Sequence, residues 1–340
     1  MPKRVTMDDV AKLAEVHKAT VSRALDPRTR DQVNAETVKR VKRAARQLGY
    51  VPNAMARGLR TSSSMTVGVI IPDLMNPIFP PIVRGIERLL QPRGYTALLA
   101  NTDGDDEVEL SAFESLLQRR VDGFILATGR LGEQPMLRRA RESGVPIVMV
   151  NRTSETGDFP VVTGDQRAGV EAALRHLFDL GHRRITHLAG PPMFSTTKAR
   201  AEAFRSICAA EPGVDGDVVE AAALTADAGE AAMDRIIATG ACPTAVLAGN
   251  DLVALGAIRA MRAHDLRVPE DVSIVGFNDM PFAADFSPAL TTVHVPLQEI
   301  GAEAARLLLS GIADAAQQPV TVSMPVEFVV RASTAPVHPA

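Results

Sequence analysis

The side chains best suited to bind phosphate groups are concentrated at the start of the chain. Residues 1–60 carry 14 Lys and Arg against 6 Asp and Glu, a formal charge of +8, whereas the remaining residues carry 23 against 34, a charge of −11. A segment rich in basic side chains attracts polyanions such as nucleic acid, while an acidic remainder is repelled by them. The same charge could also belong to a surface that only faces solvent. The charge distribution therefore indicates a nucleic-acid-binding segment, and the sequence motifs are needed to distinguish it from a surface that only faces solvent.

A second group of polar residues follows short apolar runs later in the chain. Its members are Asp73, Asn76, Thr102, Asp103, Thr128, Asn151, Arg152, Asp165, Asn250, Asp251, Asn278 and Asp279. Asn, Asp and Arg supply the donors and acceptors that hydroxyl-rich ligands need. Their commoner role at such places is to shape turns or cap helices, and for Asp165, Asp251 and Asp279 both roles are equally expected. The pattern predicts a site for a small polar ligand.

Signatures of catalysis and of cofactor binding are missing from the sequence. No Gly-x-Gly occurs, which excludes a GxGxxG dinucleotide fingerprint and a kinase-type loop, and neither a Walker loop nor GxSxG is present. The seven histidines form no metal or triad spacing, and Cys208 and Cys242 stand apart from each other and from any ligand pattern. We therefore expect no catalytic residue, no metal site and no cofactor, and the chain is not expected to be an enzyme.

Three short helices are predicted to position the basic residues near the start. Thr6 and Asp9 can cap the first helix, and Asn34 can cap the third, which ends at Gly49. The second helix, 18–25, is predicted to turn three residues inward, Val21, Ala24 and Leu25, and to leave four outside, Lys18, Ala19, Ser22 and Arg23. Two short helices joined by a tight turn and packed on a third form a helix-turn-helix, which presents its second helix to the DNA major groove.

Apolar runs alternate with helical stretches from residue 65 onward. The runs predicted as buried parallel strands are Val67–Ile71, Thr96–Ala100, Phe124–Ala127, Ile147–Val150, Ile185–Ala189, Ala245–Ala248 and Ser273–Gly276. This alternation predicts an α/β fold with doubly wound parallel sheets and ligand sites at the carboxyl ends of the strands. No run approaches the ~18 apolar residues of a membrane span, and no apolar signal stretch follows the basic start, so we expect no membrane partner and a cytoplasmic location.

Four strings in the first 60 residues have a specific spacing. They are Val5-Thr6-Met7-Asp8-Asp9-Val10-Ala11, Ala19-Thr20-Val21-Ser22-Arg23-Ala24-Leu25, Leu48-Gly49-Tyr50-Val51-Pro52-Asn53 and Ala56-Arg57-Gly58-Leu59-Arg60. Together they resemble the head and hinge of the LacI/GalR family of bacterial transcriptional regulators. The resemblance implies that Lys18, Ala19 and Arg23 face base edges. It also implies phosphate contacts, which position a protein without specifying sequence, from Thr6, Thr20, Ser22 and Asn53.

Residues 51–64 are predicted as a hinge helix and linker. Gly58 lowers the helix propensity of this segment by ~1 kcal/mol, so the helix is not expected to be stable alone. The resemblance implies that two hinge helices pair on DNA, that Ala56 and Leu59 contact it, and that Leu59 wedges into the minor groove. The alternative is that Leu59 is an exposed leucine in a linker.

Three positions depart from the pattern of the family. His17 stands where a small polar cap is usual, so the second helix is expected to start about 1 kcal/mol less favourably, unless His17 itself contacts a phosphate. Glu15 replaces a usual glycine and carries strain if the turn needs a positive φ. Ala203, where glycine is usual, is expected to narrow the ligand cleft.

The remainder of the chain resembles the effector core of the same family, which is similar to periplasmic sugar-binding proteins. The strings that carry this resemblance are Arg120-Val-Asp-Gly-Phe124, Leu180-Gly-His-Arg-Arg-Ile185 and Val268-Pro-Glu-Asp-Val-Ser-Ile-Val-Gly-Phe277. The expected fold is an N-terminal all-α helix-turn-helix head with a hinge helix, followed by a two-lobed, periplasmic-binding-protein-like α/β core. The expected parts are a head (1–50), a hinge (51–64) and a core (65–340), with lobe 1 at about 65–162 plus 293–322 and lobe 2 at about 163–292 plus 323–334.

The resemblance also implies which residues line the effector pocket. They are Asn76, Phe79, Asn151, Arg200, Asn250 and Asn278. Since the chain has no Trp, any ring stacking on the ligand falls to Phe79, Phe204 or Phe277.

The predicted function is that of a sequence-specific transcriptional regulator, most simply a repressor. It is expected to bind a pseudo-palindromic double-stranded operator as a homodimer, with a tetramer as an alternative, and to respond to a small sugar-like effector between the lobes. Release by an inducer and co-repression both remain open. The alternatives are a transport-type binding protein, which would lack the basic head, and a co-repressor protein that responds to nucleosides or purines.

Overall fold

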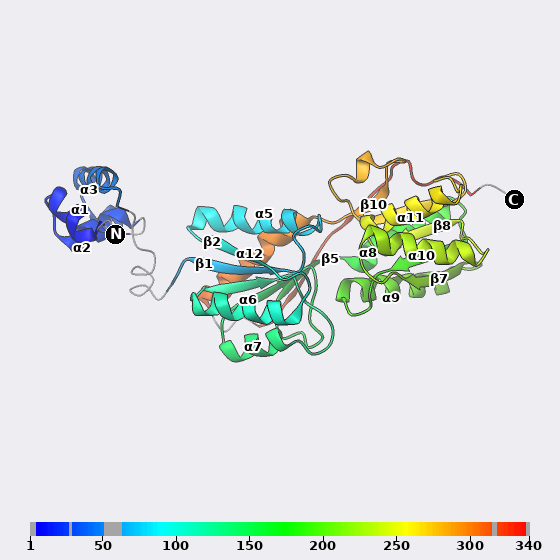
Figure 1. Cartoon of the computed structure of the whole chain (residues 1–340), viewed down its shortest axis with the longest axis horizontal. Helices are drawn as coiled ribbons and strands as arrows, with labels where there is room; N and C mark the ends of the chain where they lie inside the picture. The colour runs from blue at the N-terminus through cyan, green and yellow to red at the C-terminus, as the bar shows by residue number, and fades with distance from the viewer. Residues whose placement is uncertain (1–4, 27–28, 51–62, 315–317, 338–340) are drawn as a thin grey trace. The chain divides into compact units, whose positions relative to one another are not determined.

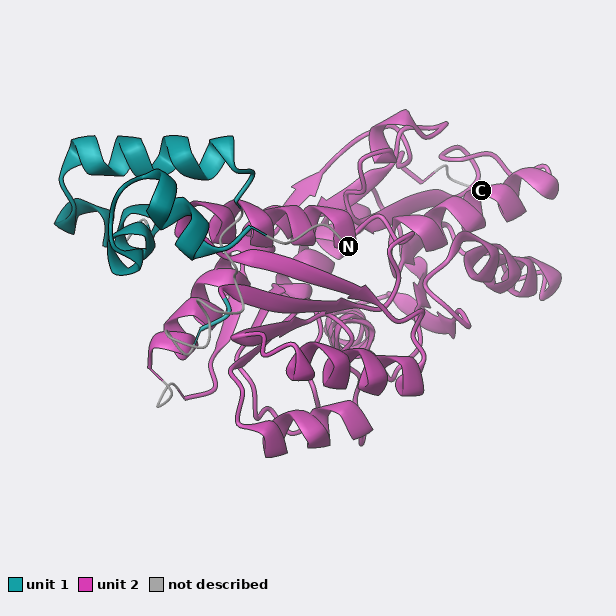
Figure 2. Ribbon diagram, turned by 60° about the vertical axis from the view of Figure 1, so that its left-hand side comes forward, with its two compact units in different colours: residues 1–64 teal, residues 65–340 magenta. Residues whose placement is uncertain are grey.

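The computed structural model describes residues 5–26, 29–50, 63–314 and 318–337. The chain divides into two compact units, Met1–Ser64 and Met65–Ala340 (Figure 2). The division falls at the end of the segment predicted as hinge and linker, of which residues 51–62 lie outside the described ranges.

The described residues of the first unit, hereafter the head, form three α-helices (Figure 1). They are α1 Met7–Leu13, α2 Lys18–Leu25 and α3 Ala35–Gln47, with a short 3-10 helix, η1 Arg30–Gln32, before α3. Each α-helix contributes one fully buried valine to the core of the head, Val10, Val21 and Val41. The arrangement is the predicted helix-turn-helix with a third packing helix.

Two helix starts in the head have the caps predicted from sequence. Thr6 and Asp9 form a reciprocal capping box at α1, and the Asn34 side chain accepts a 2.9 Å hydrogen bond from the Glu36 N–H at the start of α3. Gly49, with φ +63°, follows α3 in the left-handed conformation. Local side-chain chemistry therefore sets the helix ends here.

The second unit, hereafter the core, contains two six-stranded sheets among its described residues. The sheet of the first lobe has the order β11-β5-β4-β3-β1-β2, with β1 Thr66–Ile71, β2 Thr96–Asn101, β3 Gly123–Leu126, β4 Ile147–Val150, β5 Val161–Gly164 and β11 Thr321–Met324. The sheet of the second lobe has the order β12-β10-β9-β8-β6-β7, with β6 Arg184–Ala189, β7 Asp215–Glu220, β8 Ala245–Ala248, β9 Ser273–Asn278, β10 Thr291–His294 and β12 Glu327–Val329. All pairs are parallel except β10 with β12.

Helices cover both faces of each sheet, as expected for parallel strands joined by crossovers (Figure 1). In the first lobe these are α5 Phe79–Leu90, α6 Asp106–Gln118, α7 Pro135–Ser143 and α12 Leu297–Ala313, and in the second lobe α8 Gln166–Asp179, α9 Ser195–Ala210, α10 Ala226–Ala238 and α11 Asp251–Ala263. Short 3-10 helices lie at η2 Gln91–Arg93 and η3 Ala283–Asp285. None of the helices in the described ranges is long and apolar enough to cross a membrane.

The chain crosses between the lobes three times. The crossings follow β5, β10 and β11, because each of these strands is succeeded by an element of the other lobe. The boundaries predicted at about 162, 292 and 322 fall inside these strands, two residues before their ends. An extended strand continues into an extended crossing without a break in sequence pattern, so the hydrophobic pattern alone does not locate the crossing.

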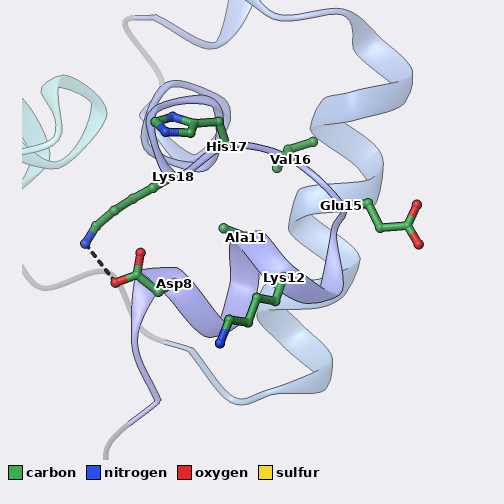
Figure 3. A pocket seen from close by; sticks show the side chains of 7 residues that line it. All are labelled: Asp8, Ala11, Lys12, Glu15, Val16, His17 and Lys18. Atoms are coloured by element: carbon green, nitrogen blue, oxygen red, sulfur yellow. Dashed lines mark hydrogen bonds and ion pairs between the residues drawn. The ribbon is translucent and has the colours of Figure 1, made fainter.

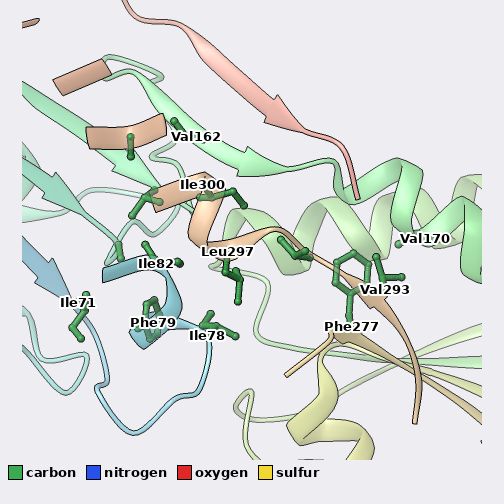
Figure 4. Packing of buried hydrophobic residues seen from close by; sticks show 14 of the residues in the cluster. Ile71, Ile78, Phe79, Ile82, Val162, Val170, Phe277, Val293, Leu297 and Ile300 are labelled. Atoms are coloured by element: carbon green, nitrogen blue, oxygen red, sulfur yellow. The ribbon is translucent and has the colours of Figure 1, made fainter. Parts of the chain in front are cut away.

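A cluster of buried apolar side chains runs from the first lobe into the second (Figure 4). It includes Ile71 and Val162 of the first sheet, Leu297 beside a crossing, and Val293 and Phe277 of the second sheet. The region beside the β10 crossing is therefore well packed, and the two lobes share one apolar cluster there.

One pair of helices in each lobe packs with glycines at the contact. In the first lobe, methyl groups added at Gly85 of α5 and Gly301 of α12 would overlap the carbonyl oxygens of Gln298 and Ile82. In the second lobe, Gly256 of α11 approaches the backbone of α10 in the same way. Glycine is needed at these positions because the two helix backbones touch.

Candidate nucleic-acid interface and ligand site

The outward face of α2 carries the residues predicted to contact DNA. Lys18, Ala19 and Arg23 are exposed, and Thr20 and Ser22 are half-buried, whereas Val21 and Ala24 pack inward. A helix with a buried apolar side and an exposed polar side can be inserted into a major groove. Three further predicted DNA contacts lie outside the described residues: Asn53, Ala56 and Leu59.

His17 caps α2, at the position where histidine was expected to start the helix less favourably than a small polar residue. Its Nδ1 accepts a hydrogen bond of 3.2 Å from the backbone N–H of Ala19. Because Nδ1 is the acceptor, the ring proton of the neutral imidazole lies on Nε2. Glu15, in the preceding turn, has φ +51°, so this position does adopt the left-handed conformation that favours glycine. Figure 3 shows both side chains in the segment that joins α1 to α2.

We expect His17→Ala to destabilise the head by about 1 kcal/mol, because the Ala19 N–H loses its acceptor. His17→Asn should leave stability unchanged or raise it, since asparagine is among the best N-caps. Amide hydrogen exchange in α2 of the whole chain measures the difference. Equal losses in the two variants would contradict the capping role.

Lys18 is engaged within the head by a neighbouring carboxylate. Its Nζ lies 2.9 Å from Oδ2 of Asp8 on α1, and both side chains are more than half exposed (Figure 3). An exposed ion pair is worth at most about 1 kcal/mol, so a base or a phosphate could replace Asp8 at small cost. The pair therefore holds Lys18 at the exposed edge of α2 without preventing a DNA contact.

Thr6 has a structural role that competes with its predicted phosphate contact. Its hydroxyl donates a 2.7 Å hydrogen bond to Asp9 Oδ2, and its oxygen accepts the Asp9 N–H at 3.3 Å. A hydroxyl has a single proton, so donation to a phosphate would have to replace the bond to Asp9.

Strained residues lie at the ends of core strands or directly after them. Asn151 follows β4 with φ +66°, and Asn278 ends β9 with φ +109°. Both are buried, and such φ values in residues other than glycine cluster at binding sites, where the surrounding structure holds them in place. These two predicted ligand residues are therefore held in positions that local preference alone would not select.

Arg200 lies buried on α9, surrounded by polar and aromatic groups of the second lobe. Its Nε donates to Gln166 Oε1 at 2.7 Å, Nη1 donates to the Gly249 carbonyl, and Nη2 lies 3.5 Å from Asn278 Oδ1. The guanidinium carbon lies 3.6 Å from the centroid of the Phe277 ring. Burial lowers the pKa of Arg200 to about 9, although the nearby Asp251 opposes this shift. The structure thus joins two predicted ligand residues, Arg200 and Asn278.

Arg152 is a second buried arginine, placed after β4 in the first lobe. Its guanidinium carbon lies 3.6 Å from the centroid of the Phe194 ring, which precedes α9 in the second lobe. Two further contacts join the same loops: the Thr153 N–H donates to Ser195 Oγ at 2.9 Å, and the Leu131 N–H donates to the Met193 carbonyl at 2.7 Å. Arg152 therefore lies where the two lobes meet.

Two buried carboxyl groups of the core have raised pKa values. Burial raises the pKa of Asp251 to about 7, although Thr292 and the Met280 N–H donate to its oxygens. Burial likewise raises the pKa of Glu109 on α6 to about 7, against a hydrogen bond from Thr128. In the described part of the chain, no group of three or more His, Cys, Asp or Glu side chains could hold a metal ion.

Three predicted ligand residues have structural roles in this conformation. Asn250 caps α11 through a 2.8 Å bond from the Val253 N–H, and its amide nitrogen donates to the Leu224 carbonyl. Phe79 is fully buried and packs beside Ile78 and Ile82 (Figure 4). Asn76 is half-buried and accepts the Ile78 N–H within the loop after β1.

The aspartates for which two roles were expected also make structural contacts. Asp165 caps α8, and Asp279 accepts a 2.7 Å bond from Arg331. Ala203, expected to narrow the ligand cleft, is buried in the apolar cluster instead.

Comparisons with known proteins agree with this architecture. Residues 6–53 match the family described as bacterial regulatory proteins, lacI family, and residues 174–334 match the periplasmic binding protein-like domain. Over 331 residues the chain is 34% identical to the HTH-type transcriptional repressor CytR of Escherichia coli (strain K12), an alignment that covers 97% of this chain and 96% of CytR. The chain belongs to the LacI family.

Solved structures of other LacI-family proteins superpose on nearly the whole chain. A Lac repressor dimer bound to operator and the anti-inducer ONPF has a TM-score of 0.86 at 28% identity and covers 98% of this chain and 100% of that one. A complex of the transcriptional regulator CelR with cellobiose has a TM-score of 0.73 at 31% identity, covering 97% and 100%. The predicted fold and the predicted class, a DNA-binding transcriptional regulator, are thereby confirmed.

Three residues with notable contacts in this LacI-family core were not singled out from sequence: Gln166, Phe194 and Glu109. Arg152 was among the polar residues that follow predicted strands, but its contact with Phe194 was not predicted. Nothing in the sequence marked Glu109, since a glutamate within a helix normally faces solvent.

Proposed function

We propose that this LacI-family regulator acts as a repressor by placing α2 in the major groove of an operator. Lys18, Ala19 and Arg23 would face the base edges, and the exposed side of α2 supports this assignment. Thr6, Thr20, Ser22 and Asn53 would hold phosphates, while Ala56 and Leu59 would contact the DNA from the hinge. Because the target is bacterial chromosomal DNA, we place the protein in the cytoplasm, and we assign no catalytic step to it.

The functional unit we propose is a homodimer. A single head makes too few contacts for tight binding, and a two-fold axis supplies a second half-site in a pseudo-palindromic operator. The family resemblance to the Lac repressor dimer, which was solved on its operator, supports this assembly.

Arg23→Ala is expected to cost about 1–3 kcal/mol on the preferred operator and to relax sequence preference at one position in each half-site. Thr20→Ala should weaken binding to all sequences alike, because a phosphate contact carries no sequence information. Fluorescence anisotropy on an operator and on single-base variants measures both, with Arg46→Ala on α3 as a control for charge. Uniform losses in Arg23→Ala, or binding of one chain per operator, would contradict the proposal.

We also propose that a small sugar-like effector binds between the lobes and contacts Asn151, Arg200 and Asn278. The buried, strained positions of the two asparagines and the side-chain hydrogen bond between Arg200 and Asn278 support this site. The likeness to the CelR complex with cellobiose supports a ligand of this class. We keep Asn76, Phe79 and Asn250 as outer candidates, because each already has a structural role.

Effector and operator should be coupled by about 1–3 kcal/mol, a 5- to 150-fold change in operator affinity, and the coupling must be reciprocal. The inducing direction is our proposal. A thermal-shift screen of sugars, sugar acids and nucleosides identifies ligands, and operator titration with each ligand measures the coupling. If a bound ligand left operator affinity unchanged, the regulatory role of this site would be wrong.

A further inference from the structure

Arg152 is a buried cation to which the described residues offer no anion. It is 5% exposed, its Nε is buried without a hydrogen-bond partner, and no ion pair to it occurs in the described ranges. The guanidinium carbon of Arg152 lies over the face of the Phe194 ring. A buried charge without a counter-charge is costly, so this position calls for a partner that the chain itself does not provide.

Arg200 adds a second buried positive charge in the same region. Its three hydrogen-bond acceptors are the neutral oxygens of Gln166, Gly249 and Asn278. Burial is the main cause of the lowered pKa of Arg200, and the positive charge of Arg152 acts in the same direction. The nearby carboxyl of Asp251 is turned to other donors, the Met280 N–H and the Thr292 hydroxyl.

The start of α9 lies beside Arg152 and adds to the positive potential. Phe194, on which Arg152 stacks, is the N-cap residue of this 16-residue helix and supplies no side-chain cap. Within the described residues, no acceptor is found for the first backbone N–H groups of α9, Ser195 to Thr197. A helix N-terminus carries about half a positive charge, so it stabilises an anion and disfavours a neighbouring arginine.

We infer that the effector of this protein carries an oxyanion, a carboxylate or a phosphate, which binds at the start of α9 between Arg152 and Arg200. The inference rests on the proposed effector site and specifies the chemistry of its ligand. Guanidinium groups and free N–H groups are the usual partners of both oxyanions. Because Arg152 and Phe194 come from different lobes, the oxyanion would link the lobes where they already touch.

Inorganic phosphate, glucose 6-phosphate, gluconate and glucose test the inference on the full-length protein. Binding is measured by calorimetry and thermal shift at constant ionic strength for wild type, Arg152→Met and Arg141→Met. Arg141 is a matched control, because its guanidinium also lies over a phenylalanine, Phe159, but is paired with Asp158. Operator binding without ligand is measured in parallel for all three proteins.

We expect saturable binding of inorganic phosphate and of at least one charged sugar to wild type, weakened at least tenfold in Arg152→Met and unchanged in Arg141→Met. Tighter binding of glucose 6-phosphate or of gluconate identifies the oxyanion. Ligand-free Arg152→Met should unfold at the same temperature as wild type or higher, whereas loss of a merely structural residue would lower it. No phosphate binding, or equal binding by wild type and Arg152→Met, overturns the inference. If glucose binds both proteins equally and no charged ligand binds, the inference is wrong and the neutral-sugar effector stays in place. If wild type did not bind the operator, the proposed regulator would be wrong instead.

Discussion

Gly256→Ala is expected to lower the free energy of unfolding of the core by at least about 3 kcal/mol, the upper end of the usual cost of overpacking. The added methyl group would overlap the carbonyl oxygen of Ala226 on α10 and lie 2.6 Å from the backbone nitrogen of Glu230. Both obstacles are backbone atoms inside a helix, so they cannot turn aside as a side chain can. The overlap in this variant is relieved only if α10 and α11 move apart, and this movement would loosen the packing of the second lobe.

Gly164→Ala is the matched control for this prediction. Its methyl group would lie 3.1 Å from a methyl group of Val295, which can shift slightly, so we expect a loss below about 1 kcal/mol. Urea unfolding of both variants and wild type gives the comparison, and thermal unfolding should show a drop of roughly 6–12 °C for Gly256→Ala. If the two variants unfolded alike, the close approach of α10 and α11 would be wrong.

Close helix packing through paired glycines occurs in both lobes. Gly85 and Gly301 let α5 touch α12 in the first lobe, and Gly229 and Gly256 let α10 touch α11 in the second. In each helix pair, the glycine of one helix faces the carbonyl of a residue three positions before the partner's glycine. Close backbone contact of this kind brings Cα–H groups and carbonyls together. Each lobe thus has one tightly joined helix pair on one face of its sheet.

Most of the head could be predicted because its signals are local. The capping box of Thr6 and Asp9 and the Asn34 cap depend on residues three positions apart or fewer. The His17 cap could not be predicted from N-cap preferences, which rank histidine low, because the bond depends on the ring tautomer and the turn geometry. The left-handed φ of Glu15 was predictable only as a consequence of the family pattern.

In the core, the buried central strands and the edge strand β2 were predicted from sequence, whereas five strands were not: β5, β7, β10, β11 and β12. Strands such as β4 and β8 are continuous apolar runs with every residue buried. The edge strand β7 reads Asp215-Gly-Asp-Val-Val-Glu220 and is mostly exposed, so no hydrophobic pattern marks it. Strands β5, β10 and β11 lie next to crossings, and β5 pairs with β11 from a distant part of the chain.

The residue types of the candidate ligand site were predictable from sequence, but the hydrogen bonds among them were not. Asn151 and Asn278 were placed by their positions after strands, and Arg200 by the family resemblance. The hydrogen bond between Arg200 and Asn278 joins residues that are 78 positions apart, whereas Asn250 caps a helix through a residue only 3 positions away. Sequence alone cannot separate such short-range capping from ligand binding. Burial of Phe79 follows from packing of α5 on distant strands and helices, which the spacing of apolar residues did not reveal.

The buried carboxyl of Glu109 should make the core less stable as the pH rises from about 4.5 to about 7. Its pKa is raised by burial from 4.5 to about 7 in the folded state, so in this window the unfolded chain releases the proton and the folded chain keeps it. The folded state then binds more protons than the unfolded state, and the free energy of unfolding falls with pH. The full loss is up to about 3 kcal/mol, reached above pH 7.

Glu109→Gln isolates this effect from other titrating groups, such as His187, whose pKa is lowered by burial to about 4 and whose contribution has the opposite sign. Glutamine keeps an oxygen for the Thr128 hydroxyl but does not ionise. The stability of the variant relative to wild type should therefore increase by up to about 3 kcal/mol between pH 4.5 and pH 8, measured by urea unfolding at each pH. Glu107→Gln, an exposed change on the same helix, should show no comparable trend. Parallel stability curves for wild type and Glu109→Gln would mean that Glu109 is ionised in the folded protein at these pH values, with Arg130 3.6 Å away as its counter-charge.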